Sequence, residues 1–178
     1  VGSGSFLLPE PRPRTVILIP GQVEDDASIR YGSATIKTNL DLIKAVRKEN
    51  SSAYLVYKPH PDVVSGNRLG QTKDEDARQY VDEIVTQADI LACIQAVDEV
   101  HTITSLSGFE ALLRDKKVTC YGAPFYSGWG LTTDKQVVER RTRKLSLEEL
   151  VAASLLIYPT YINPESGTLI DPLTALSL

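Results

Sequence analysis

The sequence predicts an α/β domain built on an open, Rossmann-like parallel β-sheet with helices on both faces. Short apolar runs recur along the chain, and such runs are typical of strands buried on both sides of a sheet. Segments with helical periodicity separate these runs, and this alternation is typical of parallel α/β folds. The 178 residues suffice for one ordinary domain with a proper core.

The first predicted elements follow an extended lead-in that is rich in proline and therefore cannot be helical. Residues 15–20, all apolar except Thr15, form the first predicted strand, which a polar loop over 21–28 follows. Residues 36–49 place Ile36, Leu40, Ile43 and Val46 near one face of a helix. Residues 53–57 form the second strand.

The middle of the chain continues the alternation. A polar segment leads to a predicted helix around 75–86, and residues 89–96 form a short helix. Residues 99–103 form the third strand, in which His101 alternates with apolar neighbours. That alternation favours a core histidine over a metal or substrate ligand.

The last predicted elements are a helix over 105–114, a strand over 118–121 and a helix over 146–158. Ser146 and Glu149 form a capping box at the start of this last helix. Between the last two elements lies a long loop, residues 122–133, that is rich in glycine and aromatic residues. Long ordered loops in compact domains are often functional.

The ends of the chain suggest a piece of a longer protein. The chain has no methionine and begins with alternating glycine and serine. We therefore expect residues 1–14 to be a tag remnant and extended lead-in, and residues 15–178 to be the domain. A processed native chain is the alternative.

Composition excludes several classes of function. A net charge of −4 makes non-specific nucleic-acid binding a poor candidate. No apolar run approaches the roughly 20 residues that span a bilayer. With two histidines, a His-rich metal centre is excluded, and Cys93 and Cys120 fit buried thiols in a reducing compartment.

Three polar segments follow predicted strands, where open α/β sheets bind ligands. The first, residues 22–26, ends in the three carboxylates Glu24, Asp25 and Asp26. They could bind a metal, supply a nucleophile or act as a base, or the loop could simply be solvated.

In the second segment, Pro59 and Pro61 hold the chain extended, so that Lys58 and His60 face one side and suit a phosphate. A rigid surface turn is the alternative.

The third segment, residues 104–110, places Ser105, Ser107 and Gly108 at a helix N-terminus, which attracts anions. A capping box from Ser107 to Glu110 is the alternative, although it leaves Ser105 and Gly108 unexplained. Together the second and third segments describe a phosphate pocket with acid groups beside it. P-loop, dinucleotide-fingerprint and hydrolase-elbow motifs do not occur.

Two further features have two interpretations each. Trp129 could stack on a base or sugar, or could plug the end of the sheet. The basic run over 140–144 could steer an anionic sugar nucleotide, although a solvated charged stretch is the simpler interpretation.

Four motifs in order, residues 21–29, 57–63, 104–112 and 121–132, resemble those of capsule polysaccharide biosynthesis proteins. The resemblance, to members that act as retaining β-Kdo glycosyltransferases in Gram-negative bacteria, runs from about Val16 to about Gly167. It implies one half of a two-domain GT-B enzyme, the donor-binding domain, with CMP-Kdo as donor and no metal or other cofactor. It also implies a glycolipid Kdo acceptor, an acceptor domain outside this chain and a cytoplasmic site at the inner membrane face. The product would be the poly-Kdo linker of lipid-anchored capsular polysaccharide.

The resemblance implies a role for each matching donor-side residue. His60 and Pro61 resemble the His-Pro motif that contacts the nucleotide phosphate in CMP-sugar transferases. Ser105 and Ser107 resemble the serines that hold the same phosphate, and Lys58 would add positive charge.

The catalytic residues implied by the resemblance lie in the first segment. Asp26 matches the nucleophile of a double displacement, with Asp25 ranked second, and Gln22 would orient that carboxylate or the sugar. Gly108 belongs to the donor site, and Glu110 would meet the ribose. A nucleotide-sugar epimerase-like domain and a non-enzymatic nucleotide-binding assembly module are the alternative functions.

Overall fold

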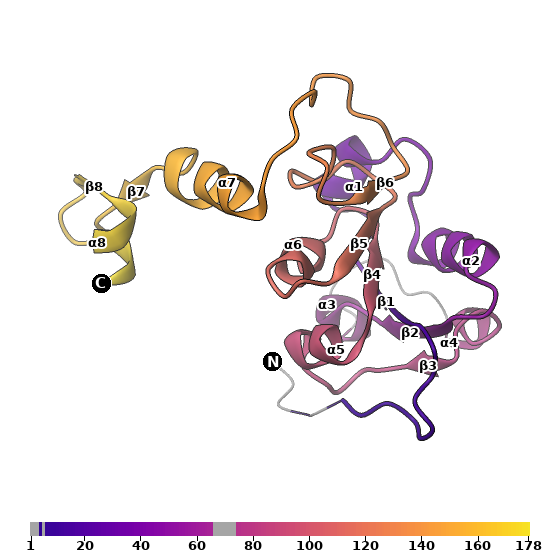
Figure 1. Ribbon diagram of the computed structural model, residues 1–178. Helices are drawn as coiled ribbons and strands as arrows, with labels where there is room; N and C mark the ends of the chain where they lie inside the picture. Colours follow the sequence, from indigo (N-terminus) through magenta and orange to yellow (C-terminus); the bar gives the residue numbers. More distant parts are fainter. Residues whose placement is uncertain (1–3, 5, 66–73) are drawn as a thin grey trace. The chain divides into compact units, whose positions relative to one another are not determined.

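The structure, a computed structural model, describes residues 4, 6–65 and 74–178 and divides into two compact units, residues 1–143 and 144–178. The first unit is built on a six-stranded sheet in the order β3-β2-β1-β4-β5-β6, with every neighbouring pair parallel (Figure 1). The strands are β1 Val16–Pro20, β2 Tyr54–Lys58, β3 Glu83–Ile84, β4 Glu99–Thr102, β5 Lys117–Cys120 and β6 Thr133–Asp134. The strand order reverses between β1 and β4, which makes this pair the topological switch point of the sheet.

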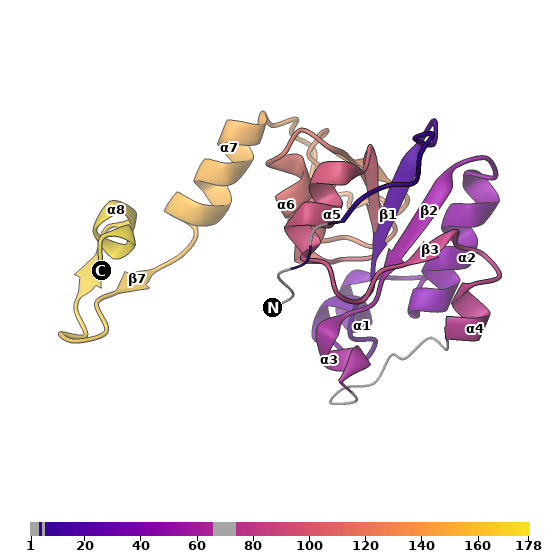
Figure 2. The ribbon, with the colours of Figure 1, turned by 90° about the horizontal axis from the view of Figure 1, so that it is seen from below.

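Helices cover both faces of this sheet, as the sequence predicts. In both ribbon views α2 lies on one side of the strands, and α5 and α6 lie together on the other (Figures 1 and 2). The helices of this unit are α1 Ala27–Gly32, α2 Asn39–Glu49, α3 Pro61–Val64, α4 Asp74–Ala77, α5 Ile90–Ala96 and α6 Leu106–Leu112.

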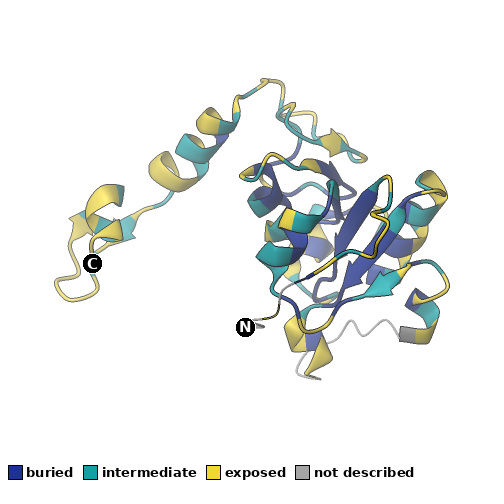
Figure 3. Cartoon of the chain, turned by 60° about the horizontal axis from the view of Figure 1, so that its bottom comes forward, coloured by how far each residue is buried: buried dark blue, intermediate teal, exposed yellow. Residues whose placement is uncertain are grey.

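The core explains why the apolar runs form strands. In β1, Ile17 and Ile19 belong to the same buried cluster as Leu42 and Ile43 of α2. The alternate β1 side chains are also fully buried, so both faces of this central strand are covered. Figure 3 shows the central strands as the most buried part of the unit. Burying each such side chain stabilises the fold by about 1.5–3 kcal/mol.

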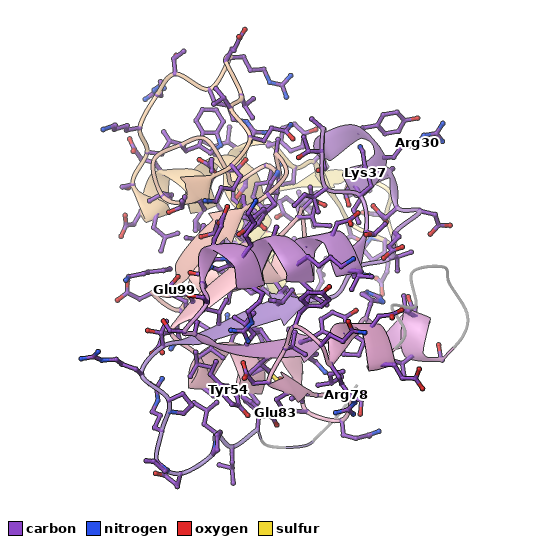
Figure 4. The ribbon with its side chains drawn as sticks, turned by 90° about the vertical axis from the view of Figure 1, so that its right-hand side faces the viewer. Arg30, Lys37, Tyr54, Arg78, Glu83 and Glu99 are labelled. Atoms are coloured by element: carbon purple, nitrogen blue, oxygen red, sulfur yellow. The ribbon has the colours of Figure 1, made fainter. Side chains whose placement is uncertain are left out.

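The predicted helix around 75–86 is wrong beyond Ala77. The helix α4 ends at Ala77, and the chain then turns so that β3 extends the sheet beside β2. The carboxylate of Asp82 accepts a bond of 2.8 Å from the backbone N–H of Leu55, which fixes this edge. Figure 4 shows Tyr54 and Glu83 on these two strands, where the Tyr54 hydroxyl donates to the carboxylate at 3.1 Å.

Other elements depart less from the sequence prediction. The loop expected over 21–28 already contains the start of α1, and the short strand β6 lies at the end of the aromatic loop. The described part of the lead-in, residues 4 and 6–14, contains no helix and packs against the unit through buried Phe6 and through a 2.8 Å ion pair between Arg12 and Asp98.

The second unit begins with the predicted capping box of Ser146 and Glu149. The helical stretch it opens is α-helical only over its first turns and then continues as a π-helix. Among the described residues, no helix is both long and apolar enough to cross a membrane. The elements are α7 Leu147–Val151, η1 Ala152–Ile157, the antiparallel strands β7 Tyr161–Ile162 and β8 Leu169–Ile170, and α8 Pro172–Leu176.

Candidate functional site

A cavity of about 370 Å³ lies beside the carboxyl ends of the central strands. The loops after β1, β2, β4 and β5 all contribute to it, so each of the three polar segments reaches this one space. This convergence is what the topology of an open α/β sheet provides at its switch point. The lining residues are Gln22, Val23, Asp26, Ser28, His60, Thr104, Ser105, Leu106, Phe125 and Tyr126.

Gln22 joins the loop after β1 to the loop after β4. Its side-chain Oε1 accepts from the backbone N–H of Thr104 at 2.9 Å and from the Thr102 hydroxyl at 3.2 Å, and its Nε2 donates to Thr104 Oγ1 at 3.0 Å. Its backbone exchanges two 2.8 Å bonds with the Asn39 side chain at the start of α2. Gln22 therefore holds the floor of the cavity in place.

The three carboxylates of the first segment have separate places. Asp26 lines the cavity and caps α1, because its Oδ1 accepts from the backbone N–H of Ser28 at 2.7 Å. Asp25 is exposed and is not among the lining residues, whereas Glu24 accepts from the backbone N–H of Asn39 at 2.7 Å. These three residues do not form a group that could hold a metal ion.

His60 is the residue of the second segment that reaches the cavity. Its Nδ1 accepts from the backbone N–H of Asp62 at 3.2 Å, which makes it the N-cap of α3. In the neutral ring the proton is therefore on Nε2, which can donate to a ligand. Pro61 is the first residue of α3, and Lys58 is buried at the end of β2. The prediction that Lys58 and His60 face one spot is wrong for this cavity.

Ser105, not Ser107, begins α6. The Ser105 hydroxyl accepts from the backbone N–H of Ser107 at 3.2 Å and lies 3.2 Å from its hydroxyl. The alternative of a capping box from Ser107 to Glu110 is therefore wrong, and the helix begins at the start of the predicted range 105–114. Neither Ser107 nor Glu110 lines the cavity, although Ser105 does.

Gly108 has a packing reason of its own. A Cβ added to this residue would lie 2.2 Å from the hydroxyl oxygen of Tyr126. The Tyr126 hydroxyl donates to the backbone carbonyl of Ser105, so this close approach ties the aromatic loop to the start of α6. Gly108 itself is buried and does not line the cavity.

The aromatic loop supplies cavity residues that motif reasoning did not single out. Phe125 and Tyr126 form part of the lining, and both rings contact Phe109 of α6. The signal in the sequence was the density of glycine and aromatic residues over 122–133. That density indicated function but could not show which rings turn inward.

Trp129 and Arg141 brace this loop. The Trp129 indole N–H donates to the Phe125 carbonyl at 2.7 Å, and the Arg141 guanidinium lies 5.5 Å from the indole ring. Arg141 also donates to the carbonyls of Pro124 and Ser127. One member of the predicted basic run is therefore structural, whereas its neighbour Arg140 is exposed.

His101 is buried, as its alternation with apolar residues predicts. Burial lowers its pKa, although Glu99 and Glu49 act in the opposite direction. Its Nε2 lies 3.3 Å from Glu99, and its Nδ1 lies 3.5 Å from the hydroxyl of Tyr121. Cys93 and Cys120 are buried too, and burial raises the pKa of the Cys120 thiol to about 12.

The fold and the position of the cavity define a Rossmann-like α/β domain with its candidate site at the switch point of a parallel sheet. The chain belongs to the capsule polysaccharide biosynthesis protein family, whose model matches residues 8–165. This match confirms the resemblance that the four motifs indicated.

Two curated relatives are similar to this chain over most of its length. The capsule polysaccharide modification protein LipA of Neisseria meningitidis serogroup B is 58% identical over 178 residues, which are 100% of this chain and 25% of LipA. The lipopolysaccharide-processing protein LpsZ of Rhizobium meliloti is 50% identical over 158 residues, 89% of this chain and 36% of LpsZ. The chain thus spans about a quarter to a third of these relatives.

Two solved structures share the fold. The β-Kdo 2,7 transferase of Thermosulfurimonas dismutans KpsC superposes with a TM-score of 0.81 at 50% identity, over 92% of this chain and 53% of that chain. The β-Kdo 2,4 transferase of the same KpsC superposes with a TM-score of 0.79 at 34% identity, over 99% of this chain and 54% of that chain. This chain therefore matches about half of each solved chain.

Proposed function

We propose that this chain is the donor-binding domain of a retaining β-Kdo glycosyltransferase that uses CMP-Kdo. The observation that carries the proposal is the convergence of Asp26, His60 and Ser105 on one cavity at the switch point. The similarity to two β-Kdo transferase structures supports the choice of Kdo as the transferred sugar.

In the proposed donor complex, His60 and Ser105 bind the phosphate of CMP. The Nε2–H of His60 and the hydroxyl of Ser105 are donors, and donors aimed at the leaving phosphate stabilise the charge that develops on it. The proposal needs no metal ion for this role. Gln22 positions the loop that carries Asp26, through its bonds to Thr104.

Retention of configuration follows from two displacements. The Asp26 carboxylate attacks the anomeric carbon of Kdo, and the bond from that carbon to the phosphate oxygen breaks, so that CMP leaves with the electron pair. A hydroxyl of the acceptor then attacks the same carbon, loses its proton to a base and releases Asp26. The base and the acceptor site belong to a second domain in this proposal.

The wider role follows from the proposed reaction. Successive transfers would build the poly-Kdo linker of a lipid-anchored capsular polysaccharide on a Kdo glycolipid. Because such an acceptor is held in a membrane, the enzyme would act peripherally at the inner membrane face.

Calorimetric titration of this chain with CMP, CDP, UMP and UDP tests the donor site. We expect selective binding of CMP that His60→Ala weakens at least tenfold. His60→Asn is the matched variant, because an Asn side chain still caps α3 but lacks the Nε2–H donor. Loss of CMP binding in both variants supports the phosphate role, whereas equal CMP affinity in all three proteins contradicts it. A preference for UDP favours an epimerase-like domain, and no nucleotide binding favours an assembly module.

The nucleophile is tested in a chain that carries this domain together with an acceptor domain. We expect mass spectrometry to locate a Kdo adduct on Asp26 after incubation with CMP-Kdo. Asp26→Asn should abolish transfer while keeping the cap of α1, and Asp25→Asn is the matched control that should retain transfer. An adduct on any other residue would refute the role of Asp26.

A further inference from the structure

A second cavity, of about 350 Å³, lies beside the first and shares part of its wall. Ser28, Thr104 and Phe125 line both cavities, so ligands bound in the two would lie close together. The helix α1 forms one side, and the turn after β5 forms the other. The lining residues are Ala27, Ser28, Tyr31, Gly32, Thr104, Ala123, Pro124 and Phe125.

The lining differs in chemistry from that of the first cavity. None of its lining residues is charged, and none is a histidine. Its two aromatic side chains are Tyr31, which is 78% exposed, and Phe125, which is 43% exposed. Beside them lie the hydroxyls of Ser28 and Thr104, of which the Thr104 hydroxyl donates to Ser28 Oγ at 3.2 Å. Apolar ring faces beside a few hydroxyl groups fit a ligand with both C–H faces and hydroxyls, which describes a sugar ring.

The floor of the second cavity is built from close backbone contacts. A Cβ on Gly122 would lie 2.9 Å from the carbonyl oxygen of Gly32 and 2.9 Å from Cγ2 of Thr104. The backbone N–H of Ala123 also donates to the Gly32 carbonyl at 2.7 Å. These contacts hold α1 against the turn after β5, so the cavity is part of the fold.

One cation contacts Tyr31, although it does not itself line this cavity. The guanidinium of Arg30 is 5.4 Å from the centre of the Tyr31 ring, and Arg30 is exposed. Figure 4 shows Arg30 projecting from α1 away from the sheet. Lys37, which is labelled near it, has its ammonium on the carbonyls of Ile29 and Arg30 and is therefore committed to the end of α1.

We infer that this second cavity is a saccharide subsite, in which a sugar ring stacks on Tyr31 and the carboxylate of a sugar acid meets Arg30. The inference rests on the proposed transferase function and deepens it. The helix that lines the subsite begins beside Asp26, so a sugar held there lies next to the proposed reacting carboxylate. An uncharged lining suits a sugar better than a nucleotide phosphate.

Nuclear magnetic resonance titration of the ¹⁵N-labelled chain tests the subsite. The probes are the methyl glycoside of Kdo, methyl glucoside as a neutral sugar, and CMP as a reporter of the first cavity. We expect the Kdo glycoside to shift the backbone amides of Gly32 and Ala123. Tyr31→Ala should weaken its binding about tenfold, and Tyr31→Phe should stay within twofold of the parent chain. Arg30→Gln should weaken binding of the Kdo glycoside and leave that of methyl glucoside unchanged.

Tyr158→Ala is the matched control, because Tyr158 is a tyrosine of the second unit that is exposed to a similar degree, 88% against 78%. The subsite is refuted if Tyr31→Ala behaves like Tyr158→Ala, or if the sugar shifts amides around His60 and Ser105 instead. Sugar binding that depends on Tyr31 without any CMP binding would keep the subsite and refute the donor site. CMP binding that depends on His60, without any effect of Tyr31 on sugar binding, would keep the donor site and refute the subsite.

Discussion

The side-chain amide of Gln22 and Thr104 form a direct bridge between the loops that follow β1 and β4, the two strands at which the sheet order reverses. The Gln22 Oε1 accepts from Thr104 N at 2.9 Å, while Gln22 Nε2 donates to Thr104 Oγ1 at 3.0 Å. Both residues are buried and both line the candidate site. The geometry of the cavity therefore depends on one amide group.

Gln22→Ala should destabilise the fold by about 1–3 kcal/mol, because it leaves the buried N–H of Thr104 without its acceptor. Urea unfolding followed by circular dichroism measures this loss. Gln95→Ala, at an exposed position in α5, is the matched control and should stay within about 0.5 kcal/mol of the parent chain. Equal stability of the two variants would show that the bridge contributes little.

Gly108→Ala should cost about 1–3 kcal/mol, because the new methyl group would overlap the hydroxyl of Tyr126. Combining it with Tyr126→Phe removes the nearest oxygen and should recover part of that loss. Thermal or urea unfolding of the parent, the two single variants and the double variant gives the coupling energy. If the two single variants change the free energy of unfolding additively in the double variant, the proposed overlap is contradicted.

Acidification should destabilise the fold through His101. Burial lowers the pKa of His101 in the folded chain, so the unfolded chain, with a pKa of about 6.5, binds the proton more readily. The stability that the neutral ring contributes is complete above that value and is lost as the pH falls towards the folded pKa. For one proton, the free energy of unfolding changes by at most about 1.4 kcal/mol per pH unit.

Urea unfolding at pH 7.5 and 5.5 checks this dependence. His101→Gln should flatten the dependence of the unfolding free energy on pH, whereas Gln95→Ala, which removes no titratable group, should retain it. An unchanged dependence in His101→Gln would assign the effect to other groups.

Arg141→Gln should loosen the aromatic loop, because Arg141 donates to the carbonyls of Pro124 and Ser127 and lies over the Trp129 ring. Trp129 is the one tryptophan in the sequence, so its fluorescence reports on this loop directly. We expect a red-shifted emission in Arg141→Gln and an unchanged emission in Arg140→Gln. A shift of the same size in both variants would mean that the charge of the basic run, not the bracing contacts, controls the loop.

Much of the fold follows from local patterns. Residues such as Ile17 and Ile19 sit in an apolar run too short for a helix, and they form a central strand buried on both faces, as predicted. The capping box of Ser146 and Glu149 also appears as predicted, because its bonds connect residues three positions apart. The residues of β3 were assigned to a helix, since their strand depends on hydrogen bonds to β2, which is distant in the sequence.

The candidate site was predictable only in part. Asp26, His60 and Ser105 could be selected because each follows a strand whose carboxyl end had to lie at the same edge of the sheet. The same rule selects Lys58, and the family resemblance adds Glu110, yet neither residue lines the cavity. Whether a side chain at a strand end turns inward depends on the backbone of the following turn.

By itself the sequence determined the α/β class, the family and three of the four loops that carry the site, because periodicity and motifs are local properties of the chain. Only the tertiary structure decided that Gly108 makes room for Tyr126 and that Tyr31 borders a second cavity. Each of these depends on which surfaces meet when the chain packs. Contacts between residues far apart in sequence are selected by the shape and burial of the whole core, and no local pattern encodes them.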